Sequence, residues 1–350
     1  MILFLSKYPQ APQEYRDGFF QRVENIDHFY LDEERVYLSA SFLKNFKKDV
    51  VKNGLRTEIK CNVFLHFFII FKLFKNSSLI YIQSIYNAMN LFLFIILFNK
   101  FYVLDLHGVV PEELEMQNKK NYAFIFKTIE KFLFKKINIC IAVTNRMANH
   151  YKSKYSESRT KYIVYAILPS HLKPYDISSF ENKDGKIEVI YSGNTQVWQN
   201  IDLMLKTIKN HQSESIHYTI LTGEPEAFNI RFKQYGIDKS QITVKSVKPE
   251  ELEIYYSASH YGFVLRDDIL INSVACPTKI VEYLNYGIIP IILSEKIGDF
   301  ESYGYEYIYL NQFSDQLKVK KSLKNISVIH RIYQTNKFNL KNEIERVKLS

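Results

Sequence analysis

Residues 266–291 read RDDILINSVACPTKIVEYLNYGIIPI, and this stretch decides the fold that we expect. A β-rich run ends at Arg266, and a loop follows it. Pro277, Thr278 and Lys279 then open a helical pattern that Gly287 ends. Another β-rich run follows at once, so a strand, a helix and a strand succeed one another as in a parallel sheet. The stretch therefore predicts an α/β fold.

The rest of the chain alternates in the same way, which predicts two Rossmann-like doubly wound domains that face a central cleft. In the first half the expected strands are Ile2–Leu5, Arg35–Ser39, Leu79–Gln83, Tyr102–Leu106 and Ile137–Val143. The expected helices between them are Gly18–Asp27, Ser41–Lys52, Tyr86–Phe98 and Tyr122–Lys135. A second series runs from a strand at Ile187–Ser192 to one at Ile289–Leu293.

The domain boundary is expected after residue 170, where prolines and polar residues lead to Asp184-Gly185, a turn pair. A chain of 350 residues is long enough for two domains. We expect an N-terminal acceptor-binding domain at 1–170 and a donor-binding domain at 171–329. A C-terminal helix at about 330–350 is expected to pack back on the first domain.

Composition limits the compartment. The cysteines are odd in number, far apart and set in apolar stretches, so they predict neither disulfides nor a metal site: Cys61, Cys140 and Cys276. Residues 1–6 resemble a first strand rather than a signal peptide. The apolar segments 63–74 and 79–98 are too short or too interrupted for the roughly 18 to 20 residues of a membrane span. We expect a cytoplasmic protein.

The helix that begins near Thr278 predicts an anion site. The first turn of a helix has unpaired N–H groups and a positive dipole, so it can bind a diphosphate. Lys279 and Arg266 are near enough in sequence to add positive charge. Glu282 follows Thr278 by about one turn.

This stretch resembles glycosyltransferase family 4 and its relatives with the GT-B fold. The resemblance implies that Pro277, Thr278 and Lys279 contact the donor diphosphate and that Glu282 contacts the ribose. The family has a further glutamate eight positions earlier that touches the donor sugar, but Val274 stands there. Asp267, Asp268 and Asn272, on the same loop, are the alternatives.

A second resemblance lies in YSGNTQVWQNIDLML, residues 191–205, where Gly193 follows a strand. The family often has an arginine after this glycine and a lysine before the helix, both on the diphosphate. Here Asn194 and Gln199 stand at those places. We expect Arg266 and Lys279 to supply the missing charge.

The first domain carries two weaker motifs. DLHGVVPEE, residues 105–113, resembles the family loop in which a histidine contacts the transferred sugar, and His107 is the matching residue. Asp105 is expected to orient its ring, and Glu113 either caps the next helix or contacts the acceptor. After the first strand, Arg16 and Gly18 stand at an expected helix start on the acceptor side of the cleft, where Arg16 either recognises an anionic acceptor or is simply solvated.

The resemblance implies a glycosyltransferase that moves a sugar from a nucleotide-sugar donor to a saccharide or lipid-linked acceptor in cell-surface polysaccharide biosynthesis, such as capsule or lipopolysaccharide. It also implies a retaining reaction with no metal and no cofactor beyond the co-substrate. His107, Arg266 and Lys279 are the catalytic candidates. The alternatives are a nucleotide-sugar epimerase of the same fold and a non-catalytic nucleotide-sugar binding protein.

The net charge of +9 leaves the partner open. Basic residues are scattered and no nucleic-acid motif is present, so we expect no nucleic-acid partner. Lys44, Lys47, Lys48 and Lys52, with the aromatic stretch 64–74, would suit a peripheral contact with the anionic inner face of the cell membrane. A solvated basic surface beside a buried helix is the alternative.

Overall fold

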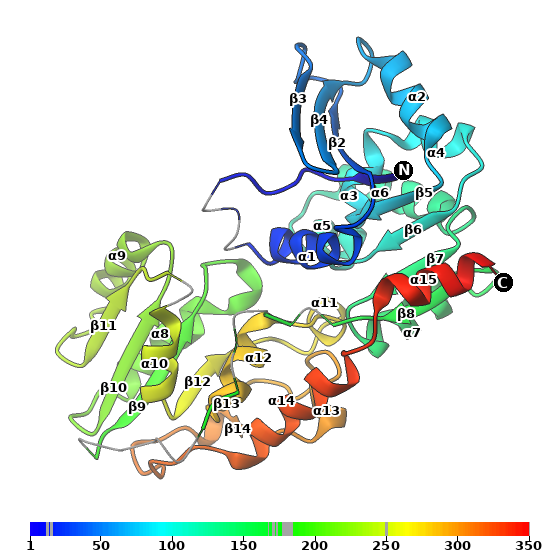
Figure 1. Cartoon of the computed structure of the whole chain (residues 1–350). Helices are drawn as coiled ribbons and strands as arrows, with labels where there is room; N and C mark the ends of the chain where they lie inside the picture. The colour runs from blue at the N-terminus through cyan, green and yellow to red at the C-terminus, as the bar shows by residue number, and fades with distance from the viewer. Residues whose placement is uncertain are drawn as a thin grey trace. The chain divides into compact units, whose positions relative to one another are not determined.

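The computed structural model describes residues 1–11, 14, 17–166, 168–169, 172, 174–176, 185–248 and 251–349. The chain forms two compact units (Figure 1). Unit 1 comprises Met1–Ile167 and Phe338–Ser350, and unit 2 comprises Leu168–Lys337. The last helix, α15 (Leu340–Leu349), belongs to unit 1: its Leu340 and Ile344 are fully buried in a cluster with Phe4 and Tyr30.

Unit 1 is built on an eight-stranded sheet with the order β3-β4-β2-β1-β5-β6-β7-β8. All neighbouring strands are parallel except β3 and β4. The strands are β1 (Ile2–Leu5), β2 (Arg35–Ser41), β3 (Asp49–Asn53), β4 (Arg56–Asn62), β5 (Leu79–Gln83), β6 (Tyr102–Asp105), β7 (Ile139–Ala142) and β8 (Lys161–Val164). Strand β1 pairs with β2 along one edge and with β5 along the other. The strand order therefore reverses at β1, and the sheet is doubly wound.

The helices of unit 1 follow its strands. They are α1 (Gly18–Asp27), η2 (His28–Tyr30), α2 (Phe67–Asn76), α3 (Ser84–Met89), α4 (Phe92–Leu97), α5 (Val110–Met116), α6 (Lys120–Leu133) and α7 (Asn145–Lys154). Ring contacts join α2 to α4 through Phe67 and Phe94, and α4 to α6 through Phe92 and Phe132. These three helices therefore pack side by side.

Unit 2 is built on a six-stranded, fully parallel sheet with the order β11-β10-β9-β12-β13-β14, the Rossmann order. Its strands are β9 (Ile187–Ser192), β10 (Ile216–Leu221), β11 (Ile242–Lys245), β12 (Tyr261–Val264), β13 (Ile289–Ile292) and β14 (Ile308–Tyr309). Its helices are η4 (Val197–Gln199), α8 (Ile201–Asn210), α9 (Pro225–Tyr235), α10 (Leu252–Ala258), α11 (Leu270–Ser273), α12 (Thr278–Asn285), α13 (Phe300–Tyr303), η6 (Leu310–Gln312) and α14 (Leu323–Thr335). Helices α8 and α9 cover one face, with Val189 and Tyr191, and α10, α12 and α14 cover the face of Ile190.

The expected α/β class with two parallel sheets is confirmed, and two expected helices are wrong. Residues 41–52 do not form a helix, because Asp49–Asn53 pair as an antiparallel edge strand with β4. Gly54, at φ 58°, turns the chain between the two strands. The single helix expected at 86–98 is two short helices, α3 and α4, which break at Asn90 and Leu91.

Candidate functional site

The site of unit 2 lies at the carboxyl ends of β9 and β12. These neighbours are where the strand order reverses, and open parallel sheets bind ligands at this point. Gly193 comes directly after β9, and Arg266 lies two residues after Val264, the last residue of β12. The sheet therefore brings together two residues that are far apart in the sequence.

The N-terminus of α12 opens beside these strand ends. Pro277 is its N-cap residue, and no side chain caps the helix. In its first turn the Ile280 N–H donates to Pro277 O at 3.1 Å, while the N–H groups of Thr278 and Lys279 have no intrahelical acceptor in an α-helix. An anion bound here would receive their hydrogen bonds and the positive end of the helix dipole.

Lys279 bends back from α12 towards Gly193. Its Nζ donates to Gln199 Oε1 at 2.9 Å and lies 4.1 Å from the ring centroid of Tyr191. A Cβ atom on Gly193 would lie 3.2 Å from this Nζ and 3.0 Å from Tyr191 Oη. Gly193 also has φ 155°, which favours glycine, so both backbone and space require glycine here.

The guanidinium of Arg266 is buried and makes few hydrogen bonds with the described residues. Its side chain donates from Nη1 to Asn272 Oδ1 at 3.2 Å, and its buried Nε has no hydrogen-bond partner among the described residues. Only 8% of Arg266 is exposed. An unpaired buried donor costs about 1–3 kcal/mol, so this nitrogen favours a ligand that accepts from it.

Two buried basic side chains, Arg266 and Lys279, therefore lie near one another. Within the described ranges, neither Arg266 nor Lys279 lies in an ion pair. Burial, with the charge of Arg266, holds the pKa of Lys279 well below its usual range, and burial lowers the pKa of Arg266 to about 10. The site is therefore short of negative charge, which a diphosphate would supply.

Glu282 points from α12 to α10. Its Oε2 accepts from Tyr256 Oη at 2.7 Å, and burial raises the pKa of this carboxyl to about 7. Glu282 keeps partial exposure. A carboxylate held by one oxygen can use the other for the hydroxyl groups of a sugar.

The loop 267–274 places its polar residues in different directions. Asn272 is fully buried and donates to Asp267 O, so it braces the loop and Arg266; the predicted contact of Asn272 with the donor is therefore corrected. Asp267 accepts from Asn200, and exposed Asp268 pairs with Lys296 at 2.7 Å. Val274 is 2% exposed.

Asn194 lies on the exposed loop after Gly193. Its carbonyl accepts from Tyr191 Oη at 2.5 Å, and its side-chain oxygen accepts from the Gln196 N–H. The backbone of this loop is therefore fixed beside Lys279. The side chain itself brings no charge to the site.

In unit 1, His107 follows β6 and contacts the end of β5. Its Nε2 lies 2.8 Å from Gln83 Oε1, and its buried Nδ1 has no hydrogen-bond partner in the described part of the chain. Burial lowers the pKa of His107 to about 4, so the ring is neutral near pH 7. With the Nε2 proton on Gln83, Nδ1 offers a lone pair to a hydroxyl. Ser84, at φ 65°, strains the backbone next to this pair.

Asp105 does not orient His107, contrary to the prediction. Both of its oxygens bind Arg22, at 2.9 and 3.0 Å, and one also accepts from Tyr81 Oη. Asp105 is 0% exposed, so it offers no surface to an acceptor, and the predicted acceptor contact is corrected too. The side chain that orients the His107 ring is Gln83.

The remaining residues of unit 1 lie at helix starts. Glu113 Oε1 accepts from the Val109 N–H at 3.1 Å, which favours the capping alternative, and a Cβ on Gly108 would collide with this carboxylate. Gly18 is the first residue of α1, whose N-cap Asp17 accepts from Phe19. Arg16 lies outside the described residues.

Comparisons with known proteins identify the fold. No protein-family model and no curated protein matches this chain. A glycosyltransferase from Rickettsia africae ESF-5 is similar in structure, with 14% identity and a TM-score of 0.61 over 99% of this chain and 97% of that one. WaaG, a glycosyltransferase involved in lipopolysaccharide biosynthesis, has 10% identity and a TM-score of 0.59 over 99% and 98%. HepE of Anabaena, in complex with UDP-glucose, has 11% identity and a TM-score of 0.56 over 97% and 91%.

The chain has the GT-B fold. Membership of family 4 stays a prediction. In this GT-B chain, no helix within the described ranges has the length and apolar character needed to cross a bilayer. Nor do the described residues contain a group of three or more His, Cys, Asp or Glu side chains placed to hold a metal ion.

Sequence reasoning missed three residues, one beside His107 in unit 1 and two at the candidate site of unit 2. Gln83 and Tyr256 hold His107 and Glu282, and Tyr283 Oη accepts from the Ser192 N–H at 2.9 Å at the end of β9. Of these three residues, only Tyr283 was indicated by a feature of the sequence. Gly262 interrupts β12, and a Cβ there would collide with the Tyr283 ring, as expected where a strand glycine marks a close approach.

Proposed function

We propose that the protein is a glycosyltransferase that takes a sugar from a nucleoside-diphosphate sugar and passes it to an acceptor hydroxyl. One observation carries the proposal: Arg266 and Lys279 are buried without an ion pair among the described residues, beside an uncapped helix N-terminus. Burying unpaired charge costs several kcal/mol, and a diphosphate offsets this cost. The structural similarity to glycosyltransferases, one of them solved with UDP-glucose, supports the proposal.

In the proposed reaction, the acceptor oxygen bonds to the anomeric carbon while the bond from that carbon to the β-phosphate oxygen breaks. The acceptor proton passes to the departing diphosphate. Negative charge develops on the leaving group, where Lys279, Arg266 and the first-turn N–H groups of α12 stabilise it. Because side-chain cations perform this task, we propose a metal-independent reaction without a further cofactor. Because the leaving diphosphate takes the acceptor proton, the acceptor attacks from the side of the leaving group, and we propose a retaining reaction.

The remaining roles are proposed from the family resemblance, and exposure and contacts support them. Glu282 binds the ribose hydroxyls, and Thr278 and Pro277 present the helix start to the diphosphate. The exposed carboxylates Asp267 and Asp268 are the candidates for the donor sugar in place of Val274. His107, whose Nδ1 has no partner among the residues that the structure describes, accepts from a substrate hydroxyl.

We further propose a saccharide or lipid-linked acceptor that is used at the inner face of the cell membrane in cell-surface polysaccharide biosynthesis, with no nucleic-acid partner. Five apolar side chains, 64% to 84% exposed, form an aromatic patch at the loop after β2 and the start of α2: Leu43, Phe46, Phe64, Leu65 and Phe68. The ring contact of Phe42 with Phe64 joins the two segments, and exposed Lys44, Lys47 and Lys48 flank them. Aromatic and basic side chains together favour an anionic bilayer surface.

The donor site has a built-in reporter. Trp198 is the only tryptophan of the chain and precedes Gln199, the partner of Lys279. We expect UDP or another nucleoside diphosphate to change its fluorescence saturably, and Lys279→Ala to remove that response, with Lys206→Ala as the control on α8. If no nucleoside diphosphate alters the fluorescence or the thermal stability of the protein, the proposal fails.

Product analysis separates the alternatives. Incubation with nucleotide sugars and no acceptor should give slow hydrolysis, because water can replace the acceptor. Isomerised sugar would instead identify an epimerase. Binding without hydrolysis or transfer to any saccharide acceptor would identify a non-catalytic binding protein.

Vesicle sedimentation tests the membrane surface. Phosphatidylcholine vesicles that contain phosphatidylglycerol should bind the protein at low salt, and Phe46→Ser/Phe68→Ser should weaken this at least about tenfold through lost apolar burial. Ile230→Ser/Ile254→Ser removes two exposed apolar side chains from unit 2 and is the matched control. Equal sedimentation of both double variants would refute the membrane contact.

A further inference from the structure

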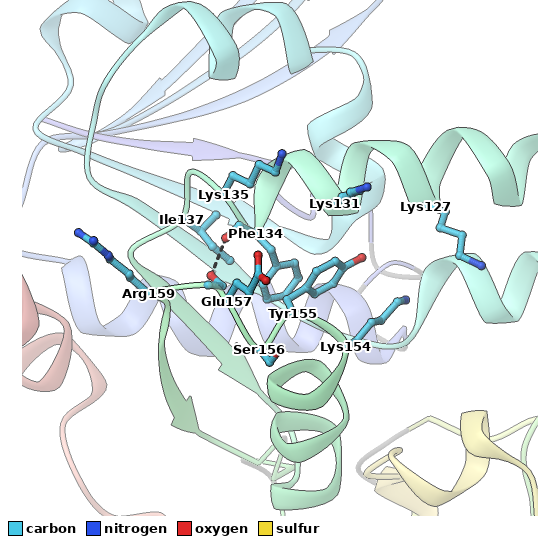
Figure 2. A pocket seen from close by; sticks show the side chains of 11 residues that line it. Lys127, Lys131, Phe134, Lys135, Ile137, Lys154, Tyr155, Ser156, Glu157 and Arg159 are labelled. Carbon is cyan, nitrogen blue, oxygen red and sulfur yellow. Dashed lines mark hydrogen bonds between the residues drawn. The ribbon is translucent and has the colours of Figure 1, made fainter.

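A second pocket lies in unit 1, between the C-terminal half of α6 and the segment that follows α7 (Figure 2). Its volume is about 690 Å³, within the range of small-molecule sites. The stacked rings of Phe134 and Tyr155, 4.4 Å apart, lie at its centre. In Figure 2 the lysines of α6 lie on one side of these rings and Arg159 lies on the other.

The charges of this pocket do not balance. Lys127, Lys131, Lys135 and Arg159 are exposed, and none has an ion pair among the described residues. Glu157 is the only acidic residue among those described as lining the pocket. Lys154 adds no free charge, because it is bound to Glu112 at 2.7 Å and to Glu130 at 2.5 Å.

Helix ends explain only part of this excess. Helices α6 and α7 both end at the pocket, and each C-terminus carries about half a negative charge, so about two positive charges remain. Lys127 and Lys131 also stand four residues apart on one helix face, where like charges destabilise the helix. Binding of an anion would relieve this repulsion.

We propose that this pocket binds a phosphate-bearing organic ligand with about two negative charges. Lys127 and Lys131 bind the phosphate oxygens, Lys135 and Arg159 add to the positive field of the pocket, and the space beside Tyr155 and Phe134 takes the rest of the molecule. The volume far exceeds that of a bare phosphate ion, which favours an organic ligand. The proposal does not depend on the transferase reaction, because no residue of the donor site contributes.

Calorimetry with phenyl phosphate, at saturating UDP to occupy the donor site, tests the proposal. We expect one binding site per chain, and binding there should leave the fluorescence of Trp198 unchanged. Lys127→Gln/Lys131→Gln should weaken binding at least roughly 30-fold, because two charged hydrogen bonds are lost. Glu157→Gln should tighten it. Lys120→Gln/Lys206→Gln, with the same charge change away from the pocket, should bind as the wild type does.

Two results would overturn the proposal: no saturable heat in the wild type, or equal affinity in the pocket and control double variants. Vesicles of phosphatidylcholine with phosphatidic acid identify the source of the phosphate. A lipid source predicts weaker sedimentation of Lys127→Gln/Lys131→Gln than of the control variant. A soluble phosphate ester predicts equal sedimentation together with the calorimetric difference.

Discussion

The ammonium of Lys279 donates to the side-chain oxygen of Gln199 across 2.9 Å, so a cation from α12 occupies the place beside η4. The family resemblance would have a lysine at position 199 itself. The same space therefore holds a positive charge that reaches it from another element. This relocation is how the proposed diphosphate site would dispense with the usual pair at 194 and 199.

The relocation predicts a charge-swap rescue. Lys279→Gln should weaken UDP binding by about 2 kcal/mol, the value of a hydrogen bond to a charged group. Adding Gln199→Lys should restore much of this affinity, because the new ammonium starts where the old one ended. Trp198 fluorescence measures both, and Lys206→Gln is the control. Wild-type affinity in Lys279→Gln would show that this lysine does not touch the diphosphate.

Glu282 predicts a pH dependence of donor binding. Its carboxyl has a pKa of about 7, and the ionised form accepts ribose hydroxyls more strongly than the neutral form. UDP affinity should therefore fall about tenfold from roughly pH 8 to roughly pH 6, as the carboxylate takes up its proton. Glu282→Gln should bind weakly and lose this change. The variant retains any pH dependence of the phosphate itself, which can thus be subtracted.

Lys279 predicts proton uptake on binding. Burial and Arg266 hold its pKa well below the usual range, and a neighbouring diphosphate raises it again. At about pH 9, where Glu282 is already ionised, UDP binding should take up a proton. Calorimetry in buffers of different ionisation enthalpy measures this uptake. Lys279→Met should abolish it, and an uptake that survives in this variant would assign it to another group.

Sequence patterns predicted the elements that have clear end signals. Helix α1 runs from Gly18 to Asp27 as expected, and its start has a clear signal in Asp17, the N-cap residue that accepts from the Phe19 N–H. By contrast, β3 is an edge strand whose five residues are all exposed, so it lacks an apolar face. The lysines of residues 41–52 resemble a helix surface, whereas Asn53-Gly54 is the hairpin signal that marks the turn between β3 and β4.

Arg266, Lys279 and Glu282 share one motif, so the sequence alone could name them as candidates, and their roles stay predictions. The site was not predictable where partners come from separate elements. Gln83 meets His107 because β5 pairs with β6 and places Gln83 beside Asp105, two residues before the histidine. Strand order is a property of the folded sheet, so no local pattern could name Gln83 or distinguish it from Asp105.

The buried pair of Arg22 and Asp105 predicts a stability effect confined to unit 1. Arg22→Met should cost about 3–5 kcal/mol, because Asp105 would keep a buried charge with only Tyr81 to bind it. Arg22→Met/Asp105→Asn should recover part of this loss. Circular dichroism during urea unfolding should show an earlier transition, while Trp198 in unit 2 should report an unchanged one.

An exposed pair provides the comparison. Arg231 and Asp202 lie 3.3 Å apart on the surface of unit 2, and Arg231→Met should cost less than about 1 kcal/mol. A similar small cost for Arg22→Met would mean that water or another group compensates Asp105.

His107 and Gln83 predict a separation of turnover from donor binding. His107→Ala should lower kcat about 100-fold if the ring contacts the reacting groups, while UDP affinity, read from Trp198, should not change. Gln83→Leu removes the acceptor that orients the ring and should lower kcat less. Gln83→Glu restores an acceptor for Nε2–H and, by its charge, raises the low pKa of His107. Its rate should therefore recover and gain a new acid limb, which a merely structural role of Gln83 would not produce.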